Sequence, residues 1–303
     1  MRDRRGQERR VCPNERCKNH SVPSFDFTKD GLYLRKTGKK DHVQRYRCRA
    51  CGKRFHGTYG RLTYRQRKPE INKPFVEVYL SGVSLRRTAH ILKVNRKTLA
   101  RRILTQGAMA RKCHEDRLLK SDDFKGRNYS FDDMITKVGS KYFPVSLSIA
   151  VNEDTGKIVD IKASRINAYG YPARNSSKVP GITKVQTDLH NQEMINVLSA
   201  IKIASKGTKF FLHTDKARNI VTPGKIALGK DFVHKPVKSP KKGEQRTGFS
   251  AMFWLNHVCA RIRADLARMG RSSWCFSRSI DSLQSHLDMF MDFFNNRQYR
   301  IAS

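Results

Sequence analysis

A run of β-forming residues with polar residues in the gaps lies before the middle of the chain. Asn128–Val138 predicts a β-strand, with the β-formers Tyr129, Phe131, Met134, Ile135 and Val138. Tyr142–Asn152 and Lys157–Ile166 predict two further strands, joined by a hairpin turn at Glu153–Gly156. A helical pattern over Thr183–Ser205, a short buried strand over Lys209–Asp215 and a further strand over Asp231–His234 follow. This order predicts a mixed α/β domain.

Three short helices are predicted upstream, over Pro74–Leu80, Ser84–Leu92 and Arg96–Leu104. Ser84 is a suitable N-cap, and the apolar residues of the last two helices are spaced for packing at a steep angle. This pattern is typical of a helix-turn-helix, whose second helix enters the major groove of DNA. A small helical domain with a solvated basic face is the alternative. The residues expected to face DNA are Arg96, Lys97, Arg101 and Arg102.

Further helical patterns connect and close the chain. Ala108–Asp123 is charged and is expected to be a helical connector, and Phe249–Met269 is predicted to be a helix. The last helix is amphipathic, and its apolar stripe consists of Ile280, Leu283, Leu287, Phe290 and Phe294. The expected domains are residues 1–60, 70–107 and 127–303, with residues 108–126 as the connector.

Four of the seven cysteines form two close pairs, Cys12 with Cys17 and Cys48 with Cys51. Four thiolates in two pairs suit tetrahedral Zn²⁺ in a structural site. The second pair lies in a strand followed by a tight Gly turn, as in a zinc ribbon. Unligated thiols are the alternative, and His20 or His56 could replace one ligand. The pattern also favours a reducing compartment over a secreted disulfide framework.

The charge of the chain indicates a polyanionic partner. The 303 residues contain 62 Lys and Arg against 26 Asp and Glu, which gives a net charge of +36 and a pI near 10.4. Nucleic acid is the first candidate for the partner, and an anionic membrane surface is the second. No apolar run is long enough for a transmembrane helix, and no signal peptide is apparent, so we expect a soluble intracellular protein.

Two adjacent acids, Asp132 and Asp133, stand in the middle of the first predicted strand. Consecutive side chains on a strand point to opposite faces, so only one of them can enter a given cleft. The predicted element order is that of the ribonuclease-H-like fold, in which the first and fourth strands are neighbours. Asp132 and Asp215 would then meet and could share two Mg²⁺ ions for phosphoryl transfer. The alternative is that one Asp is solvated and the other pairs with a nearby Lys.

The third ligand of such a site usually comes from the helix that follows. Asn256 stands at that place, where a neutral amide oxygen is a legitimate hard ligand but weaker than a carboxylate. A structural role, in which Asn256 caps or bridges within the core, is the alternative. Glu244 in the preceding loop is a further candidate.

Taken together, these motifs resemble the zinc-ribbon insertion-sequence transposases of bacteria, over nearly the whole chain. The resemblance rests on CPNERC, YRCRACGKRF, SLRRTAHILKVNRKTLARRI, FDDM, HTD and the closing LARMGRSSWCFSRSIDSLQSHL. It implies a zinc ribbon and a helix-turn-helix that find element ends, and a Mg²⁺-dependent DDE-type nuclease domain. Asp132 matches the first acid and Asp215 the second, whereas Asn256 stands where the glutamate usually stands.

The sequence therefore predicts a DNA transposase that binds element ends and catalyses strand cleavage and transfer. We expect it to bind double-stranded DNA as a dimer or larger assembly, associated with the nucleoid in the bacterial cytoplasm. Because Asn256 replaces an acid, a catalytically weak or inactive DNA-binding regulator is the alternative. A zinc protein that binds RNA is a more distant one, since the ribbon lacks runs of stacking aromatics.

Overall fold

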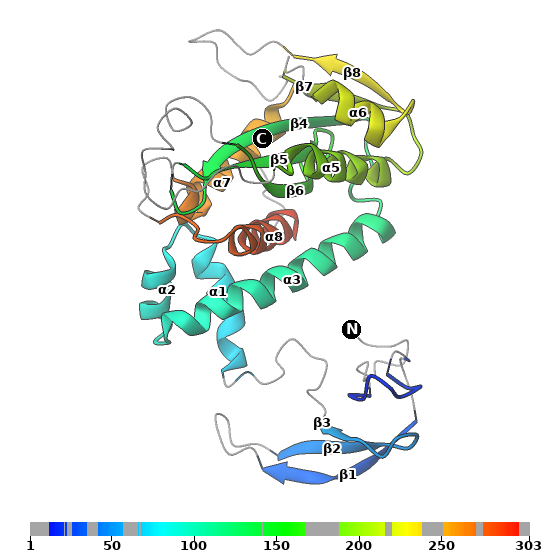
Figure 1. Ribbon diagram of the computed structural model, residues 1–303, viewed down its shortest axis with the longest axis vertical. Helices are drawn as coiled ribbons and strands as arrows, with labels where there is room; N and C mark the ends of the chain where they lie inside the picture. Colours follow the sequence, from blue (N-terminus) through cyan, green and yellow to red (C-terminus); the bar gives the residue numbers. More distant parts are fainter. Residues whose placement is uncertain are drawn as a thin grey trace. The chain divides into compact units, whose positions relative to one another are not determined.

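The computed structural model describes residues 12–20, 22, 26–34, 42–56, 66, 68–140, 142–167, 188–215, 220–237, 251–270 and 275–296. The chain divides into two compact units, Met1–Asn72 and Lys73–Ser303, which we call the N-terminal and C-terminal units (Figure 1). Glu244 and residues 183–187 of a predicted helix lie outside the described residues.

The N-terminal unit contains a three-stranded antiparallel sheet in the order β1-β2-β3 (Figure 1). Its strands are β1 (Phe27–Leu34), β2 (His42–Cys48) and β3 (Arg54–His56). The buried cluster is small, because it consists of Tyr46, Phe55 and three cysteines, with the half-buried Phe27 packed against it. So little apolar burial contributes only modestly to folding, and the unit needs a further source of stability.

The C-terminal unit contains a five-stranded mixed sheet in the order β6-β5-β4-β7-β8. β5 is antiparallel to both β4 and β6, whereas β7 runs parallel to β4 and to β8. The strands are β4 (Asn128–Lys137), β5 (Pro144–Asn152), β6 (Ile158–Arg165), β7 (Phe210–Thr214) and β8 (Phe232–Pro236). Each overlaps a strand predicted from the sequence, and the predicted mixed α/β class is confirmed.

Helices cover this sheet (Figure 1). α5 (His190–Ser205) packs on β5 and β6, and α6 (Val221–Leu228) packs on α5. Their apolar side chains share a core with Tyr129 and Phe131 of β4. α7 (Phe253–Asp265) contacts β4 and β5, and the short η4 (Ala267–Met269) and α8 (Ile280–Asn296) follow it. None of the described helices is both long enough and apolar enough to cross a bilayer.

The predicted helix-turn-helix segment forms α2 (Leu85–Ile91) and α3 (Arg96–Lys120), preceded by η1 (Pro69–Ile71) and α1 (Asn72–Tyr79). Side chains cap both α2 and α3. Ser84 Oγ accepts the N–H of Arg87 at 3.3 Å, and Asn95 Oδ1 accepts the N–H of Lys97 at 2.8 Å. These caps fix where each helix begins, on either side of a short turn.

α3 is one helix of 25 residues, so the boundary predicted between residues 107 and 108 lies inside it. Gly107 is the last residue of the domain expected over residues 70–107. In the structure it is buried where α3 crosses α8, and a Cβ added to it would lie 2.4 Å from Cβ of Ser285. Close packing of two helices therefore requires this glycine, and the helix continues through it.

α8 contacts both α3 and β6, and its polar side chains pair with the edge of that strand. Asn295 accepts the N–H of Ile158 and donates to its carbonyl oxygen, both at 2.9 Å. Gln284 accepts the N–H of Ala163 at 2.8 Å and donates to the carbonyl oxygen of Ile161 at 2.9 Å. Backbone groups that would otherwise be open at the sheet edge are thus satisfied by side chains.

Ion pairs join α3 to α8 and the sheet. Arg111 lies 2.5 Å from Asp160 of β6 and 2.5 Å from Asp288 of α8, and all three side chains are largely buried. Nearer the end of α3, Arg117 pairs with Asp292 at 2.5 Å in a more exposed position. A buried cation with two carboxylate partners makes α3 an integral part of the C-terminal unit.

Candidate functional site

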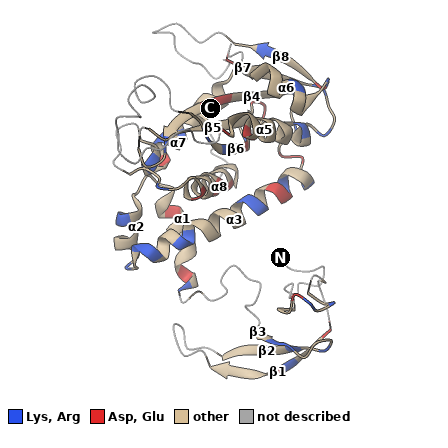
Figure 2. Ribbon diagram, in the orientation of Figure 1, with Lys and Arg blue, Asp and Glu red and all other residues tan. Residues whose placement is uncertain are grey.

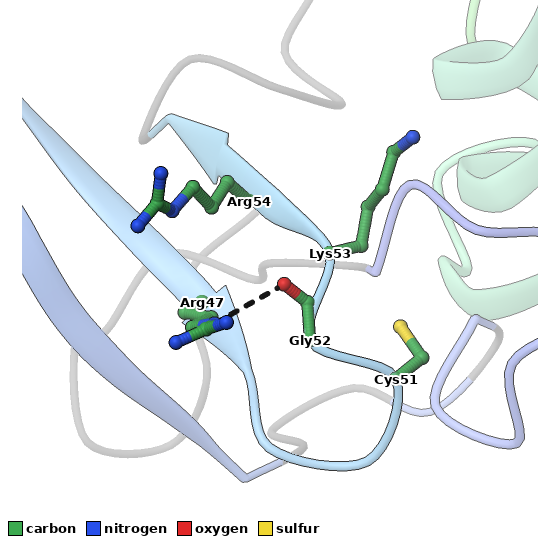
Figure 3. A pocket seen from close by; sticks show the side chains of 5 residues that line it. All are labelled: Arg47, Cys51, Gly52, Lys53 and Arg54. Atoms are coloured by element: carbon green, nitrogen blue, oxygen red, sulfur yellow. Dashed lines mark hydrogen bonds between the residues drawn. The ribbon is translucent and has the colours of Figure 1, made fainter.

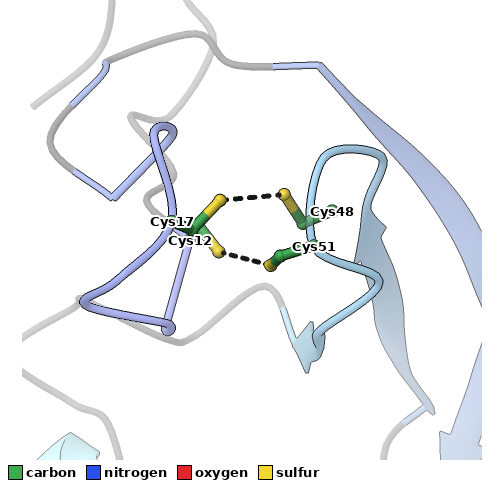
Figure 4. A group of neighbouring side chains, drawn as sticks. All are labelled: Cys12, Cys17, Cys48 and Cys51. Carbon is green, nitrogen blue, oxygen red and sulfur yellow. Dashed lines mark hydrogen bonds between the residues drawn. The ribbon is translucent and has the colours of Figure 1, made fainter.

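Four cysteines from two turns of the N-terminal unit converge on one point (Figure 4). The sulfurs of Cys12 and Cys51 are 3.5 Å apart, those of Cys17 and Cys48 are 3.8 Å apart, and all four lie within 4.8 Å of one another. Four sulfurs held about 2.3 Å from a tetrahedral zinc ion would be separated by roughly 3.8 Å. The four thiols could therefore hold a metal ion such as zinc, in agreement with the sequence prediction.

Backbone hydrogen bonds shape the two cysteine turns. Cys17 donates its N–H to the carbonyl oxygen of Asn14 at 3.0 Å in the first turn. In the second, Gly52 donates its N–H to the carbonyl oxygen of Cys48 at 2.9 Å. Gly52 has a φ of +70°, a conformation that favours glycine. The Gly that the sequence placed after the second cysteine pair is thus what allows the turn to close.

The two histidines considered as substitute ligands have other contacts. Nδ1 of His20 lies 2.8 Å from the carbonyl oxygen of Cys12 and so supports the first turn. The ring of His56 lies 5.9 Å, centroid to centroid, from that of Tyr33. The donor set of the metal site is accordingly the four cysteines.

The thiols differ in acidity. Burial raises the pKa of Cys12 to about 12. Burial also opposes ionisation of Cys48, but hydrogen bonds from the backbone of Cys51, the side chain of Asn19 and the backbone of Ala50 outweigh it and lower its pKa to about 6. Cys48 is therefore largely a thiolate at neutral pH, which is the form that binds metal, and metal binding would drive the other thiols to ionise.

Basic side chains surround the second cysteine turn (Figure 3). A shallow depression of about 610 Å³ is lined by Arg47, Cys51, Gly52, Lys53 and Arg54. Arg47 Nε donates to the carbonyl oxygen of Gly52 at 3.3 Å, and Arg54 forms a 2.7 Å ion pair on its other side with an aspartate of β1. Lys53 is exposed and points away from both arginines (Figure 3). Three positive charges thus border the candidate metal site.

Asp132 and Asp215 each lie one residue beyond the last pair in the parallel pairing of β4 with β7, which is Phe131 with Thr214. Asp132 belongs to β4, whereas Asp215 directly follows the end of β7. Partners in neighbouring strands point to the same face, and such strands lie about 4.8 Å apart. Thr214 Oγ1 donates to the carbonyl oxygen of Asp215 at 2.7 Å, and Val237 N–H donates to that of Thr214 at 2.8 Å. These bonds fix the chain at the end of β7.

The adjacent acid, Asp133, points to the opposite face of the sheet. Its Oδ2 lies 3.1 Å from Nε2 of His190, the first residue of α5. Its Oδ1 accepts hydrogen bonds from Ser148 at 2.7 Å and from Ser146 at 3.2 Å. The hydrogen bond to Asp133 raises the pKa of His190. Asp133 is therefore bonded on the α5 face, and Asp132 is the acid on the other.

Asn256 lies in the first turn of α7, the helix that contacts β4 and β5. Its Nδ2 donates to the carbonyl oxygen of Met252 at 2.7 Å, which orients the amide. An amide has its donor and acceptor on separate atoms, so this bond uses the nitrogen and turns the oxygen away from Met252. Among the described residues, the four cysteines are the group of three or more Cys, His, Asp or Glu side chains close enough to share an ion.

Glu153 is a buried acid that the sequence did not single out. From the turn after β5, its carboxylate accepts the N–H groups of Trp254 at 3.0 Å and Leu255 at 3.2 Å, at the start of α7. Ser130 of β4 donates to the same carboxylate at 2.5 Å. Burial raises the pKa of Glu153. Because Ser130 and Asp132 are two positions apart on a strand, Glu153 holds the start of α7 over the face that carries Asp132.

Three of the four basic residues expected to face DNA are exposed at the start of α3: Arg96, Lys97 and Arg101. Figure 2 shows basic residues along α2 and the first turns of α3. Arg102 differs, since it is only 6% exposed, and the expectation that it faces DNA is wrong. Arg102 is three residues after Leu99 and directly before Ile103, and both of these side chains are fully buried. Arg102 therefore lies on the packed side of α3.

Comparison with known proteins leaves the family of this chain open: no protein-family model matches it, and neither does any curated protein. What the chain does is therefore inferred from its own residues.

Proposed function

We propose that this chain is a DNA transposase, which binds the ends of a mobile element and catalyses metal-dependent strand cleavage and transfer. The observation that supports this most directly is the register of β4 with β7, which would set Asp132 beside Asp215 when continued one residue beyond Phe131 and Thr214. The strand order β6-β5-β4-β7-β8, with three antiparallel strands followed by two parallel ones, agrees with the ribonuclease-H-like topology predicted from the sequence.

The residues of this face suit a hard cation. Carboxylate and amide oxygens are the ligands that Mg²⁺ favours, and Asp132, Asp215 and Asn256 would hold it. When bound, Mg²⁺ would activate the attacking oxygen and stabilise the leaving one. The chain itself supplies position: two paired strands present the carboxylates, and Glu153 fixes the start of the helix that carries Asn256.

Recognition of duplex DNA is assigned to α2 and α3. A short turn joins them, and the exposed Arg96, Lys97 and Arg101 stand where a recognition helix would enter the major groove. The basic depression beside the cysteines, with Lys53 extended, would add sequence-independent contacts to phosphates. Because both ends of an element must be cut, we propose that the protein acts as a dimer or larger assembly on DNA, in the bacterial nucleoid.

The adjacent acids Asp132 and Asp133 provide a matched test. The substrate is a duplex that carries the short inverted repeats expected to flank the reading frame, incubated with Mg²⁺ or Mn²⁺. We expect Asp132→Asn and Asp215→Asn to abolish cleavage and to retain DNA binding, whereas Asp133→Asn still cleaves, because Asp133 is bonded to His190 on the other face. Equal cleavage by wild type and Asp132→Asn would refute the proposed nuclease.

A second function, that of a DNA-binding regulator without nuclease activity, is favoured by one observation. Asn256 is neutral, and its amide nitrogen is bonded to the backbone of its own helix. In that case wild type would protect its site in a footprint without cutting it in either metal, and Asp215→Asn would have no phenotype. The same cleavage assay, run on wild type and Asn256→Ala, separates the two functions.

A further inference from the structure

A pocket of about 580 Å³ in the C-terminal unit is lined by arginines from separate segments of the chain. It lies among the starts of α2 and α3, the turn η4, and the segment Cys275–Ser282 that leads into α8. We call it the arginine pocket, because four guanidinium groups line it: Arg86, Arg96, Arg268 and Arg278. Serine hydroxyls complete the polar lining, and none of the described residues that line it is acidic.

Arg268 holds together the segments that line the arginine pocket. It donates to Ser277 Oγ at 2.9 Å, to the carbonyl oxygen of Ser282 at 3.0 Å and to the hydroxyl of Tyr79 at 2.5 Å. These bonds tie the Cys275–Ser282 segment to α1. Since protein groups use these donors of Arg268, its role is to shape the pocket around the other three arginines.

Those three arginines present their charge to solvent. Arg86, Arg96 and Arg278 are exposed, and within the described ranges none of them has an acidic partner in hydrogen-bond or ion-pair distance. Arg96 is also the first residue of α3, where a long helix adds partial positive charge. Like charges around one cavity repel one another unless an anion lies between them. Guanidinium groups match the geometry of a phosphate, with two parallel hydrogen bonds each.

We propose that the arginine pocket binds a backbone phosphate of the duplex whose major groove α3 enters. This inference rests on the proposed function, because it assumes that the chain binds DNA. It adds a contact from the Cys275–Ser282 segment, which belongs to neither of the helices assigned to recognition.

The same segment is joined to the strand that carries Asp132. Gly139 N–H donates to the carbonyl oxygen of Ser277 at 2.7 Å, and Ser277 forms a β-bridge with Val138. Val138 follows Asp132 by six positions, which corresponds to about 20 Å along an extended strand. About six base pairs of DNA cover that length. One duplex can therefore reach both the arginine pocket and the acids.

The salt dependence of DNA binding tests the pocket through Arg278. The full-length zinc-loaded chain is titrated with a fluorescent 30-base-pair duplex at several salt concentrations. We expect Arg278→Gln to weaken binding to every duplex and to reduce the slope of log affinity against log salt by about one. Arg86→Gln is a second variant with the same expected effect. Arg127→Gln is the control, because Arg127 is exposed next to the opposite end of β4 and should leave the slope unchanged.

Thiol modification reports on the pocket directly, since Cys275 lines it and is exposed. Saturating duplex should slow alkylation of Cys275 several-fold, as measured by peptide mass spectrometry. Cys113 is exposed on α3, well beyond its first turns, and serves as the internal control whose rate should not change. In a parallel sample, inorganic phosphate replaces the duplex at the same phosphate concentration.

The outcomes separate this inference from the proposed function. Protection of Cys275 by duplex, together with a reduced slope in Arg278→Gln, supports it. If a mobility shift shows bound duplex while Cys275 is unprotected and both arginine variants keep the wild-type slope, the pocket assignment is overturned and DNA binding stands. Equal protection by inorganic phosphate would assign the pocket to a small free anion and overturn the backbone contact. If no duplex binds at all, the proposed function fails, and this inference fails with it.

Discussion

The buried cluster described in the N-terminal unit contains two aromatic side chains and three thiols, whereas the C-terminal unit packs helices on a five-stranded sheet around a large apolar core. The small unit has four thiols close enough to bind one ion. In the large unit, ion pairs such as those of Arg111 join the helices to the sheet. Metal ligation by the four thiols would thus replace apolar burial as the source of stability in a segment too short to build a large core.

The two candidate metal sites differ in the same sense. The cysteine site is formed within one small sheet, has four soft ligands and would contribute to folding. Asp132 of β4 and Asp215 after β7 are far apart in sequence. At the magnesium site that we propose, their mutual repulsion would have to be tolerated by a fold that is stable for other reasons. Removal of metal should therefore unfold one unit and leave the other folded.

The largest expected effect is loss of the N-terminal unit on removal of zinc. Zinc binding contributes about 10 kcal/mol or more to the folding of small cysteine sites. We expect Cys48→Ser, or a strong chelator, to unfold residues 12–56 while β4–β8 stay folded. Hydrogen exchange should show rapid exchange of the β2 amides and unchanged protection of β4 and β5.

Cys113→Ser is the matched control for this prediction, because it removes an exposed thiol from α3. It should change neither the zinc content of about one ion per chain nor the exchange of the β2 amides. Protection of β2 that survives complete removal of the metal would show that the aromatic cluster alone holds the unit together.

The next largest effect is expected at Arg111 in the C-terminal unit. Arg111→Ala leaves the buried carboxylates of Asp160 and Asp288 without their cation, which costs about 3–5 kcal/mol in the free energy of unfolding. Arg117→Ala breaks the more exposed pair with Asp292 and should cost about 1 kcal/mol. Urea unfolding of both variants measures the difference. Equal losses in the free energy of unfolding would mean that the burial of the Arg111 ion pairs does not increase the cost of breaking them.

Local pattern was sufficient to predict the five strands of the C-terminal unit and the cysteine turns, but not β1 of the N-terminal unit. Cys48 and Cys51 are three residues apart next to Gly52, so one turn fixes both sulfurs. Which of Asp132 and Asp133 faces the candidate site could not be derived in this way, because adjacent acids on a strand are equivalent until their partners are known. The partner that decides it is His190, at the start of a helix far along the chain.

Tertiary packing accounts for the other differences from the sequence predictions. A domain boundary was expected between residues 107 and 108, yet α3 continues through Gly107, which is needed where α3 crosses α8 at Ser285. Arg102 was expected to face DNA with its basic neighbours, but the length of α3 and its packing bury that side of the helix. Glu153 carried no signal at all, since a turn glutamate gives no local indication that it will cap a distant helix.

Two buried histidines should make the stability of the C-terminal unit depend on pH. Burial lowers the pKa of His114 to about 4 and that of His286 well below its ordinary value. Both bind protons near pH 6.5 in the unfolded chain. The unfolded state therefore binds more protons below pH 6.5, and each histidine lowers the free energy of unfolding by up to about 1.4 kcal/mol per pH unit as the pH falls.

His286→Phe tests this contribution and keeps the ring stacking with Tyr79, whose centroid is 4.1 Å away. Between pH 7 and pH 5, wild type should lose about 2 kcal/mol more than the variant in urea unfolding. His90→Gln is the control, because His90 is exposed on α2 and should leave the pH dependence as in wild type. If His286→Phe keeps the full pH dependence of the wild type, other groups are responsible for the pH dependence of stability.

The smallest predicted effect lies at Glu153, the acid that fixes α7. Glu153→Gln removes the negative charge from the start of that helix and leaves one acceptor oxygen for the two N–H groups, so we expect a loss of about 1 kcal/mol. Asp154→Asn is a matched control from the same turn, because Asp154 accepts the N–H groups of Arg127 and Asn128 at the start of β4.

The two variants should lose similar stability but differ in where the structure opens. In Glu153→Gln the amides of Trp254 and Leu255 should exchange faster, and in Asp154→Asn they should exchange as in wild type. If Asn256 takes part in cleavage, Glu153→Gln should also lose more activity than its stability explains, because the helix that carries Asn256 is no longer held. Unchanged exchange at Trp254 and Leu255 would instead mean that packing alone positions α7 over Asp132, without the buried carboxylate.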